Sequence, residues 1–206
     1  MRIYENHKGD NRFMFRQSTD ARVALFLANG CEEIEALTVA DILYRAGIPC
    51  TKVSIHETRE VTSSHELTML ADTTVGEINF EDYEMLVLPG GIPGTPNLAA
   101  CEPLMEAVVS FAGRAAEGKT VAAICAAPSI LGNLGLLRGK KATVNPGFIS
   151  AVVESGADHT GEKVTVDGNI ITSQAMGTAI PFALTIVEHF LGKETADHLS
   201  KNILYT

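Results

Sequence analysis

The segment that decides the fold is an apolar run that ends in a cysteine, Lys119-Thr-Val-Ala-Ala-Ile-Cys125-Ala-Ala-Pro-Ser-Ile-Leu131. Residues 120–124 have the character of a short buried strand. A helix is predicted from Ala126 onward, because Pro128 is tolerated in a first turn. Cys125 then stands on a tight strand-to-helix turn that presents a nucleophile. The helix N-terminus favours the thiolate, so we expect an easily ionised thiol; a buried structural cysteine is the alternative.

Length, charge and cysteine usage limit the class of protein. The 206 residues predict a flexible N-terminal extension at 1–20, which lacks the apolar core of a secretory signal, and a single domain at 21–206. A formal net charge of -9 disfavours nonspecific nucleic-acid binding and anionic membrane surfaces, and no apolar stretch approaches the ~20 residues of a membrane span, so we expect no specific nucleic-acid partner and no membrane. Four widely spaced cysteines, with no C-x-x-C motif and no zinc-type histidine pattern, predict a reduced, cytoplasmic protein without a metal.

Strand-like and helix-like segments alternate along the chain, which predicts an α/β fold with a mainly parallel sheet. The expected strands are 22–28, 50–55, short edge strands within 63–71, 85–88, 120–124 and 142–144, with a hairpin over 163–173 around Asp167-Gly168. The expected helices are 33–46, 103–116, 126–135, 178–191 and 195–203. A flavodoxin-like, doubly wound sheet with helices on both faces fits this alternation best, although the order of the strands cannot be read from it.

Three unusual segments follow predicted strands. They are 29–35 (Asn-Gly-Cys-Glu-Glu-Ile-Glu), 88–91 (Leu-Pro-Gly-Gly) and the turn at Cys125. Sites in such sheets form beyond the carboxyl ends of the strands, so we expect the three segments to meet in one site.

Three carboxylates, Glu32, Glu33 and Glu35, crowd the start of the first helix. Acids at a helix N-terminus complement its dipole, and this alone explains one or two of them. The apolar neighbours Ile34 and Ala36 indicate a partly buried turn, so one carboxyl can point inward. Burial and a nearby thiolate would raise the pKa of that carboxyl and make it a general acid. Helical spacing permits any of the three to take this position.

The same acids disfavour a nucleotide cofactor, because they would repel a phosphate at the first strand-helix turn. The chain also has no G-x-G-x-x-G and no P-loop, and we expect no cofactor. The Pro-Gly-Gly turn is either a plain tight turn or a source of catalytic N–H groups. In the second case Gly91 and Ala126 would form an oxyanion hole. The histidines, among them His65 and His159, follow no catalytic motif, and surface or packing roles are favoured for them.

Four motifs together resemble the DJ-1/ThiJ/PfpI superfamily, most closely its parkinsonism-associated deglycase branch. They are Gly-Cys-Glu-Glu-Ile-Glu-Ala, Val-Leu-Pro-Gly-Gly, Ala-Ala-Ile-Cys-Ala-Ala-Pro and Thr-Ser-Gln-Ala-Met-Gly-Thr, and the similarity runs from about Arg22 to Tyr205. The resemblance implies a flavodoxin-like homodimer in which Cys125 is a reactive, oxidation-sensitive nucleophile. It implies that Glu35 is a protonated carboxyl hydrogen-bonded to the sulfur, with Gly91 and Ala126 as oxyanion donors.

The chain departs from the superfamily pattern at three places. Asn145-Pro146 stands where several members carry histidine, so proton transfer would fall to Glu35, water or a partner subunit. Ala175-Met176 replaces the usual Gly-Pro, and Cys125 is followed by alanine instead of the histidine of protease-like members, which argues against peptidase activity. Gly90, Asn145 and Met176 are expected to line the pocket.

The resemblance implies a cofactor-independent thiol enzyme of the glyoxalase III or deglycase type, acting on small reactive dicarbonyls or their adducts through Cys125 and Glu35. The alternative is a redox-sensing stress protein or chaperone in which Cys125 is oxidised to a sulfinate. A third possibility is a small-molecule binding domain with an incidental cysteine, which predicts an ordinary thiol pKa near ~8.5.

Overall fold

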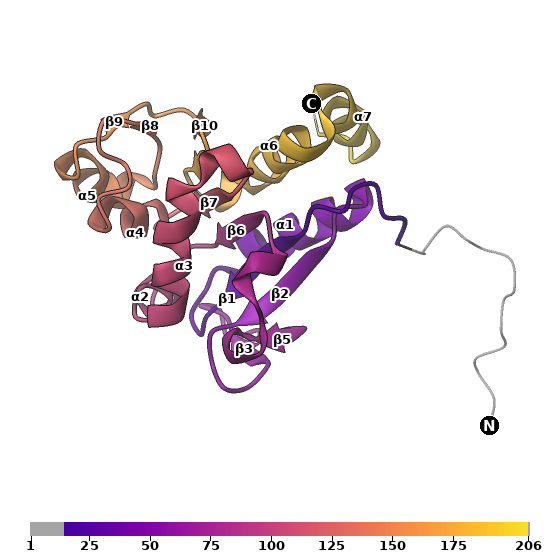
Figure 1. Ribbon diagram of the computed structural model, residues 1–206, viewed down its shortest axis with the longest axis horizontal. Helices are drawn as coiled ribbons and strands as arrows, with labels where there is room; N and C mark the ends of the chain where they lie inside the picture. The colour runs from indigo at the N-terminus through magenta and orange to yellow at the C-terminus, as the bar shows by residue number, and fades with distance from the viewer. Residues whose placement is uncertain (1–14, 206) are drawn as a thin grey trace, which may run out of the picture.

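The computed structural model describes residues 15–205, and a seven-stranded sheet lies at its centre (Figure 1). Its strand order is β10-β11-β7-β6-β1-β2-β5, and every neighbouring pair is parallel except β10 and β11. The strands are β1 Val23–Leu27, β2 Cys50–Ser54, β3 Glu60–Thr62, β4 Thr68–Leu70, β5 Thr73–Thr74, β6 Met85–Leu88, β7 Thr120–Ile124, β8 Lys141–Ala142, β9 Asp158–His159, β10 Val164–Asp167 and β11 Ile170–Ser173.

Helices cover both faces of the sheet. They are α1 Glu33–Ala46, α2 Gly94–Ala99, α3 Glu102–Gly113, α4 Pro128–Asn133, α5 Ile149–Glu154, α6 Ala179–Leu191 and α7 Lys193–Asn202. One core packs α1, α6 and α7 against the sheet, and the other packs α2, α3, α4 and α5 against the opposite face (Figure 1). The side chains of β1 alternate between these cores, so the strand is buried on both faces, as parallel strands require. The predicted doubly wound α/β fold is confirmed.

The strand order explains where the site forms. The chain runs from β1 outward to β2 and β5, then returns to β6 on the other side of β1. The loops that leave β1 and β6 therefore diverge at a topological switch point, where α/β folds place their ligands. Because β7 lies next to β6 and parallel to it, the turn at Cys125 lies at the same carboxyl end of the strands.

The expected elements are confirmed for α1, β6 and the hairpin of β10 and β11, which turns through Gly168 and Asn169. The prediction of edge strands within 63–71 was wrong in placement. β3 and β4 form a separate antiparallel ribbon, and the edge of the main sheet is β5. Residues between the two strands of the ribbon bond instead to the loop after β1, where Ser64 N–H donates to Cys31 O at 2.9 Å.

The predicted extension at 1–20 lies largely outside the described residues. Residues 15–20 carry no helix or strand and run past the end of α1, where Ser18 N–H donates to Gly47 O at 2.8 Å. Among the described residues, no helix combines the length and apolar character needed to cross a membrane.

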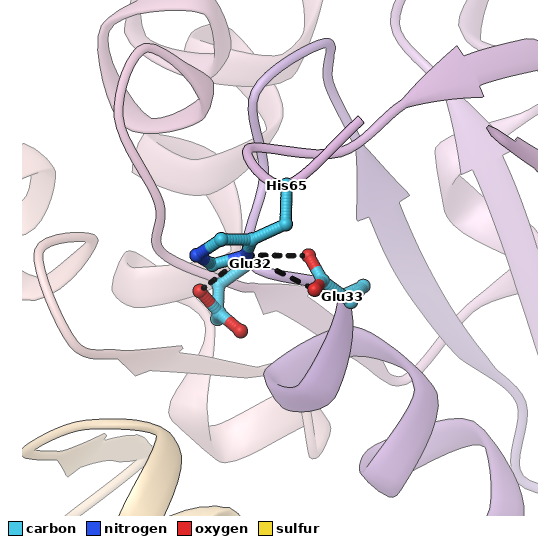
Figure 2. A group of neighbouring side chains, drawn as sticks. All are labelled: Glu32, Glu33 and His65. Atoms are coloured by element: carbon cyan, nitrogen blue, oxygen red, sulfur yellow. Dashed lines mark hydrogen bonds and ion pairs between the residues drawn. The ribbon is translucent and has the colours of Figure 1, made fainter. Parts of the chain in front are cut away.

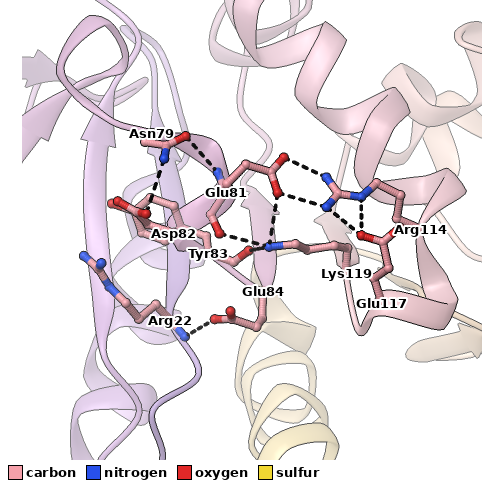
Figure 3. Close-up of polar contacts among 9 residues, drawn as sticks. All are labelled: Arg22, Asn79, Glu81, Asp82, Tyr83, Glu84, Arg114, Glu117 and Lys119. Atoms are coloured by element: carbon pink, nitrogen blue, oxygen red, sulfur yellow. Dashed lines mark hydrogen bonds and ion pairs between the residues drawn. The ribbon is translucent and has the colours of Figure 1, made fainter.

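A buried lysine, Lys119, lies at the start of β7, and it joins the elements at the end of the strands opposite to Cys125 (Figure 3). Lys119 is 7% exposed, and its Nζ donates to the carbonyl oxygens of Tyr83 and Glu81. The ammonium also lies 5.1 Å from the ring centre of Phe111, and Arg114 clamps the carboxylate of Glu81 with two hydrogen bonds of 2.7 and 2.9 Å. These contacts fix the turn that leads into β6, and hence the position of the Pro-Gly-Gly turn at the other end of that strand.

Replacing Lys119 by alanine is expected to lower the free energy of unfolding by about 3 kcal/mol, because the buried carbonyl of Tyr83 and the partly buried carbonyl of Glu81 lose their donor and the alkyl stem leaves a cavity. Urea denaturation measures the change. Lys193→Ala is the matched control, since Lys193 forms an exposed ion pair with Asp197 and its removal should leave the midpoint nearly unchanged. Equal effects of the two substitutions would contradict the structural role given to Lys119.

Candidate active site

Cys125 occupies the sharp turn between β7 and α4 that the sequence predicts. Its φ is +65°, a left-handed conformation that a residue with a side chain adopts only under constraint. The constraint is visible on both sides of the residue: Cys125 N–H donates to Ser173 O at 3.0 Å, and Cys125 O accepts from Asn145 N–H at 2.9 Å. The turn is therefore held by two segments distant in sequence, and it directs the sulfur into the site.

Gly90 forms the wall opposite Cys125. A Cβ at this position would lie 2.6 Å from the Cys125 Cβ, 2.9 Å from Glu35 Oε2 and 3.0 Å from the Ala126 nitrogen. Only glycine fits so close an approach. The next residue, Gly91, has φ +95°, and a Cβ there would lie 2.4 Å from the Glu32 nitrogen. The Pro-Gly-Gly turn is therefore more than a plain turn, since its backbone packs directly on the reactive groups.

Gly90→Ala is expected to push Cys125 and Glu35 apart and to lower the rate of Cys125 alkylation by iodoacetamide at least about tenfold. Gly113→Ala is the matched control, because a Cβ at that helical position would have no atom within 4 Å beyond its chain neighbours and the backbone of its own helix. Alkylation is followed by mass spectrometry of the intact protein. An unchanged rate in folded Gly90→Ala protein would show that this contact does not position the sulfur.

Glu35 is the carboxyl that points inward. It is 1% exposed, and its Oε2 accepts a 2.8 Å hydrogen bond from Gly90 N–H. Its Oε1 is buried and has no hydrogen-bond partner among the described residues, and the Cys125 thiol and the Met176 backbone both favour the charged form of the carboxyl. Burial raises the pKa of Glu35 to about 7, although these contacts oppose the rise. Sequence spacing allowed any of three glutamates to point inward, and in the structure Glu35 does so.

The Cys125 thiol differs from the sequence expectation. Burial, followed by the charge of Glu35 and its hydrogen bond, raises the pKa of Cys125 to about 12, while the N–H groups of Ala126 and Gly91 act in the opposite direction. The prediction of an easily ionised thiol was therefore wrong in direction, because enclosure by the neighbouring segments outweighs the helix N-terminus. Because burial raises both pKa values and the charge of Glu35 raises that of Cys125 further, the two groups lose their protons in succession, and the pair holds one proton between the two steps.

Asn145 and Met176 complete the site in different ways. Asn145 Oδ1 accepts from Gly147 N–H at 3.0 Å, which leaves its Nδ2 facing the Cys125 sulfur at 3.8 Å. Met176 is 53% exposed, and its backbone lies near enough to Glu35 to lower the pKa of that carboxyl. The residues predicted for the site, Cys125, Glu35, Gly90, Gly91, Ala126, Asn145 and Met176, all meet at this one place.

Sequence reasoning missed Thr178, which holds the turn that carries Met176. Its Oγ1 accepts from Ala175 N–H at 3.0 Å and lies 2.7 Å from Ser173 Oγ. The sequence does contain a signal for this contact: Thr178 follows Ala175 by three residues, a common spacing for hydrogen bonds between a side chain and the backbone.

Glu32 and Glu33 meet His65 of the β3–β4 ribbon (Figure 2). His65 Nδ1 lies 3.0 Å from Glu33 Oε1 and 3.6 Å from Glu32 Oε2. One ligand atom from each residue lies within 4.8 Å of the others, a spacing that a metal ion can bridge, although the sequence shows no metal motif. The hydrogen bond to Glu33, followed by the charges of Glu33 and Glu32, raises the pKa of His65.

Fold and site together define a flavodoxin-like protein with a cysteine on a nucleophile elbow beside a buried carboxyl. The chain belongs to the DJ-1/PfpI family, whose model matches residues 21–189. It is 37% identical to DJ-1 homolog A of Arabidopsis thaliana over 88% of this chain, although the match spans only 46% of that protein. It is 33% identical to a protein named a deglycase from Pyrococcus horikoshii, over 74% of this chain and 89% of that protein. Oxidized DJ-1 of Toxoplasma gondii has a similar structure, with a TM-score of 0.83 and 32% identity over 90% of this chain and 99% of that one.

Proposed function

We propose that the protein is a cofactor-independent thiol enzyme that converts small reactive dicarbonyls, or their adducts, into hydroxy acids. The observation that carries the proposal is the pairing of Cys125 with buried Glu35, which share one proton near neutral pH. The similarity to a protein named a deglycase supports it. An enzyme that adds a thiol to an aldehyde needs a proton acceptor beside the sulfur and donors for the developing oxyanion, and these residues supply both.

In the first step the sulfur of Cys125 attacks the aldehyde carbon of methylglyoxal. A C–S bond forms, the carbonyl π bond breaks, and its electron pair moves onto oxygen. The N–H groups of Gly91 and Ala126, which oppose the rise in the pKa of Cys125, stabilise this oxyanion. The single proton of the pair passes through Glu35 to the oxygen, which gives a hemithioacetal.

In the second step the Glu35 carboxylate removes the proton from the former aldehyde carbon and returns a proton to the former ketone carbon, while the hydroxyl proton moves from the oxygen of the first carbon to the oxygen of the second. The first carbon is oxidised by two electrons and the second is reduced by two, so no external oxidant is needed. The product is a lactoyl thioester on Cys125. Water then hydrolyses the thioester, which releases lactate and regenerates the pair. The sum is methylglyoxal plus water giving lactate.

The test is lactate formation from methylglyoxal by the purified full chain, without glutathione and with EDTA present. Each methylglyoxal consumed should yield one lactate. In D₂O the lactate should carry deuterium at its second carbon, because Glu35 exchanges its proton with solvent before returning it. Disappearance of methylglyoxal without lactate would mean that protein amines and thiols merely trap the aldehyde, and the proposed reaction would then fail.

Absence of turnover would leave the sensing alternative, which has its own signature. Mild peroxide should then raise the mass of the protein by about 32 Da, with the change confined to Cys125 as a sulfinate. If the protein forms no lactate and peroxide leaves Cys125 unoxidised, both the enzyme and the sensor are excluded. A small-molecule binding domain would then remain.

We also infer a homodimer in the cytoplasm. The outer side of α1 leaves Ile34 and Leu37 45% and 43% exposed, and Leu37 lines a groove with Ile180 of α6 and Ile203. The same groove is lined by the ion pair of Asp41 and Arg45, and exposed apolar side chains beside charged ones favour burial against a second copy. Light scattering on the purified protein measures its mass in solution, and a monomer at micromolar concentration would contradict the dimer. Four free cysteines accord with a reducing compartment.

A further inference from the structure

The side chain of Asn145 is fixed from several directions beside the Cys125 sulfur. Its main-chain N–H donates to Cys125 O at 2.9 Å, and its main-chain carbonyl accepts from Phe148 N–H at 2.8 Å. Its side-chain Oδ1 accepts from Gly147 N–H at 3.0 Å. A backbone N–H can only donate, so this last contact decides which end of the amide is the oxygen. The Nδ2 group therefore faces the sulfur, at 3.8 Å.

The contact between Nδ2 and the sulfur is a weak one. Nδ2 carries two protons, and within residues 15–205 its one acceptor is the Cys125 sulfur, a poor acceptor. An oxygen that bears negative charge accepts a hydrogen bond more strongly. The amide of Asn145 consequently gains a better partner when an oxygen-bearing molecule joins the sulfur. A contact that strengthens during the reaction, and is weak before it, is the kind that accelerates a reaction.

The reach of this amide suits one class of substrate. A vicinal dicarbonyl has its two carbonyl carbons bonded to each other. After a thiol adds to one of them, the oxygen of the other lies three bonds from the sulfur. A donor that already contacts the sulfur is within hydrogen-bond reach of that oxygen. In the proposed reaction the N–H groups of Gly91 and Ala126 serve the first oxygen, and Asn145 is free to serve the second.

We propose that the Asn145 amide binds the second carbonyl oxygen of a vicinal dicarbonyl and so selects this class of substrate. The same contact assists the second step of the reaction. When Glu35 removes the carbon-bound proton, the electron pair of that bond forms a double bond between the two carbons. The π bond of the second carbonyl breaks, and its electron pair moves onto the oxygen, where Asn145 stabilises the charge. The inference rests on the proposed function and names the residue that recognises the second oxygen.

The first experiment measures recognition without turnover. Iodoacetamide alkylates Cys125 in the full chain, peptide mass spectrometry follows the rate, and the readout is the aldehyde concentration that halves it. Methylglyoxal is compared with propanal, which lacks the second carbonyl, at times too short for turnover. In Asn145→Ala the half-protecting concentration of methylglyoxal should rise about tenfold, and that of propanal should change less than about twofold, because one hydrogen bond is lost with one aldehyde only.

Lactate formation gives the second readout. Asn145→Ala should lower kcat/KM for methylglyoxal about a hundredfold, the usual effect of removing one oxyanion donor. Asn145→Asp should lower it at least as much, because the carboxylate can still accept from Gly147 N–H but places an acceptor where the donor stood. Asn133→Ala is the matched control, since it removes an exposed amide at the end of α4 and should leave both readouts unchanged.

A loss of protection that is confined to methylglyoxal supports the inference. Equal changes for the two aldehydes, or no change, would overturn it, and lactate formation by the wild-type protein would then leave the proposed function standing. If the wild-type protein forms no lactate but Asn145→Ala loses protection by methylglyoxal alone, the proposed reaction fails and the recognition role is sustained. If circular dichroism shows that Asn145→Ala does not fold, Asn145→Asp decides both readouts, because it keeps the bond from Gly147.

Discussion

Replacing Cys125 by serine is expected to abolish lactate formation, with a fall in kcat/KM on the order of a thousandfold or more. The hydroxyl is a far weaker nucleophile than a thiol, and a carboxyl with a pKa near 7 is too weak a base to activate it. The serine is nearly isosteric, and the turn is held by backbone bonds to Ser173 and Asn145, so the fold should persist. The measurement is lactate production from methylglyoxal at neutral pH, with unfolding temperature as the check on folding.

Cys101→Ser is the matched control for this experiment. Cys101 is also a half-buried free cysteine, but it lies at the start of α3, away from the site residues. Its replacement should leave turnover unchanged. Comparable activity in wild type and Cys125→Ser would show that the measured chemistry belongs to another group, and two equally inactive proteins would remove the enzyme proposal altogether.

Glu35→Gln is expected to lower kcat/KM by about two orders of magnitude or more, because the amide can neither accept the proton of the pair nor return it to carbon. The pH profile carries a second signature. Burial raises the pKa of Glu35 to about 7, so the pair carries its negative charge only above that pH. Wild-type kcat/KM should therefore rise about tenfold per pH unit below pH 7 and level off above it. Glu35→Gln should lack this rise.

Glu106→Gln serves as the control, since it removes one exposed glutamate without touching the site. Deuterium incorporation adds a separate readout: whatever lactate the Glu35→Gln protein forms in D₂O should derive its carbon-bound proton by another route. A wild-type profile that is flat between pH 5.5 and 8.5, or a Glu35→Gln protein with wild-type turnover, would contradict the role proposed for this carboxyl.

Local sequence patterns predicted several elements well, because the signals that start and stop these elements lie within a few residues of them. Helix α1 begins at Glu33 and ends at Ala46 as expected, because apolar spacing and a left-handed Gly47 are both local signals. Strand order was not predictable, since Val23 of β1 pairs with Met85 of β6 across the intervening β2–β5 segment. For the same reason the ribbon of β3 and β4 was misplaced at the sheet edge, although its strand character was expected.

In the candidate site, too, local sequence predicted some features, and others depend on segments distant in sequence. The meeting of three strand-end segments followed from the α/β fold, but spacing alone could not choose between Glu32 and Glu35. That choice depends on where Gly90 places its N–H, which is set by β6 and by the pairing of β6 with β1. The direction of the Cys125 pKa was mispredicted because the local turn reveals the helix N-terminus but not the enclosure by segments far away in sequence.

The buried carboxyl of Glu35 also links the pH of the solution to the folding equilibrium. Because the pKa of Glu35 rises from 4.5 in the unfolded chain to about 7, the folded state binds this proton more tightly, and the associated stability is complete below pH 4.5. It is lost as the pH rises through 7, a difference on the order of 3 kcal/mol. The form of the protein that is ready to react is thus also its less stable form.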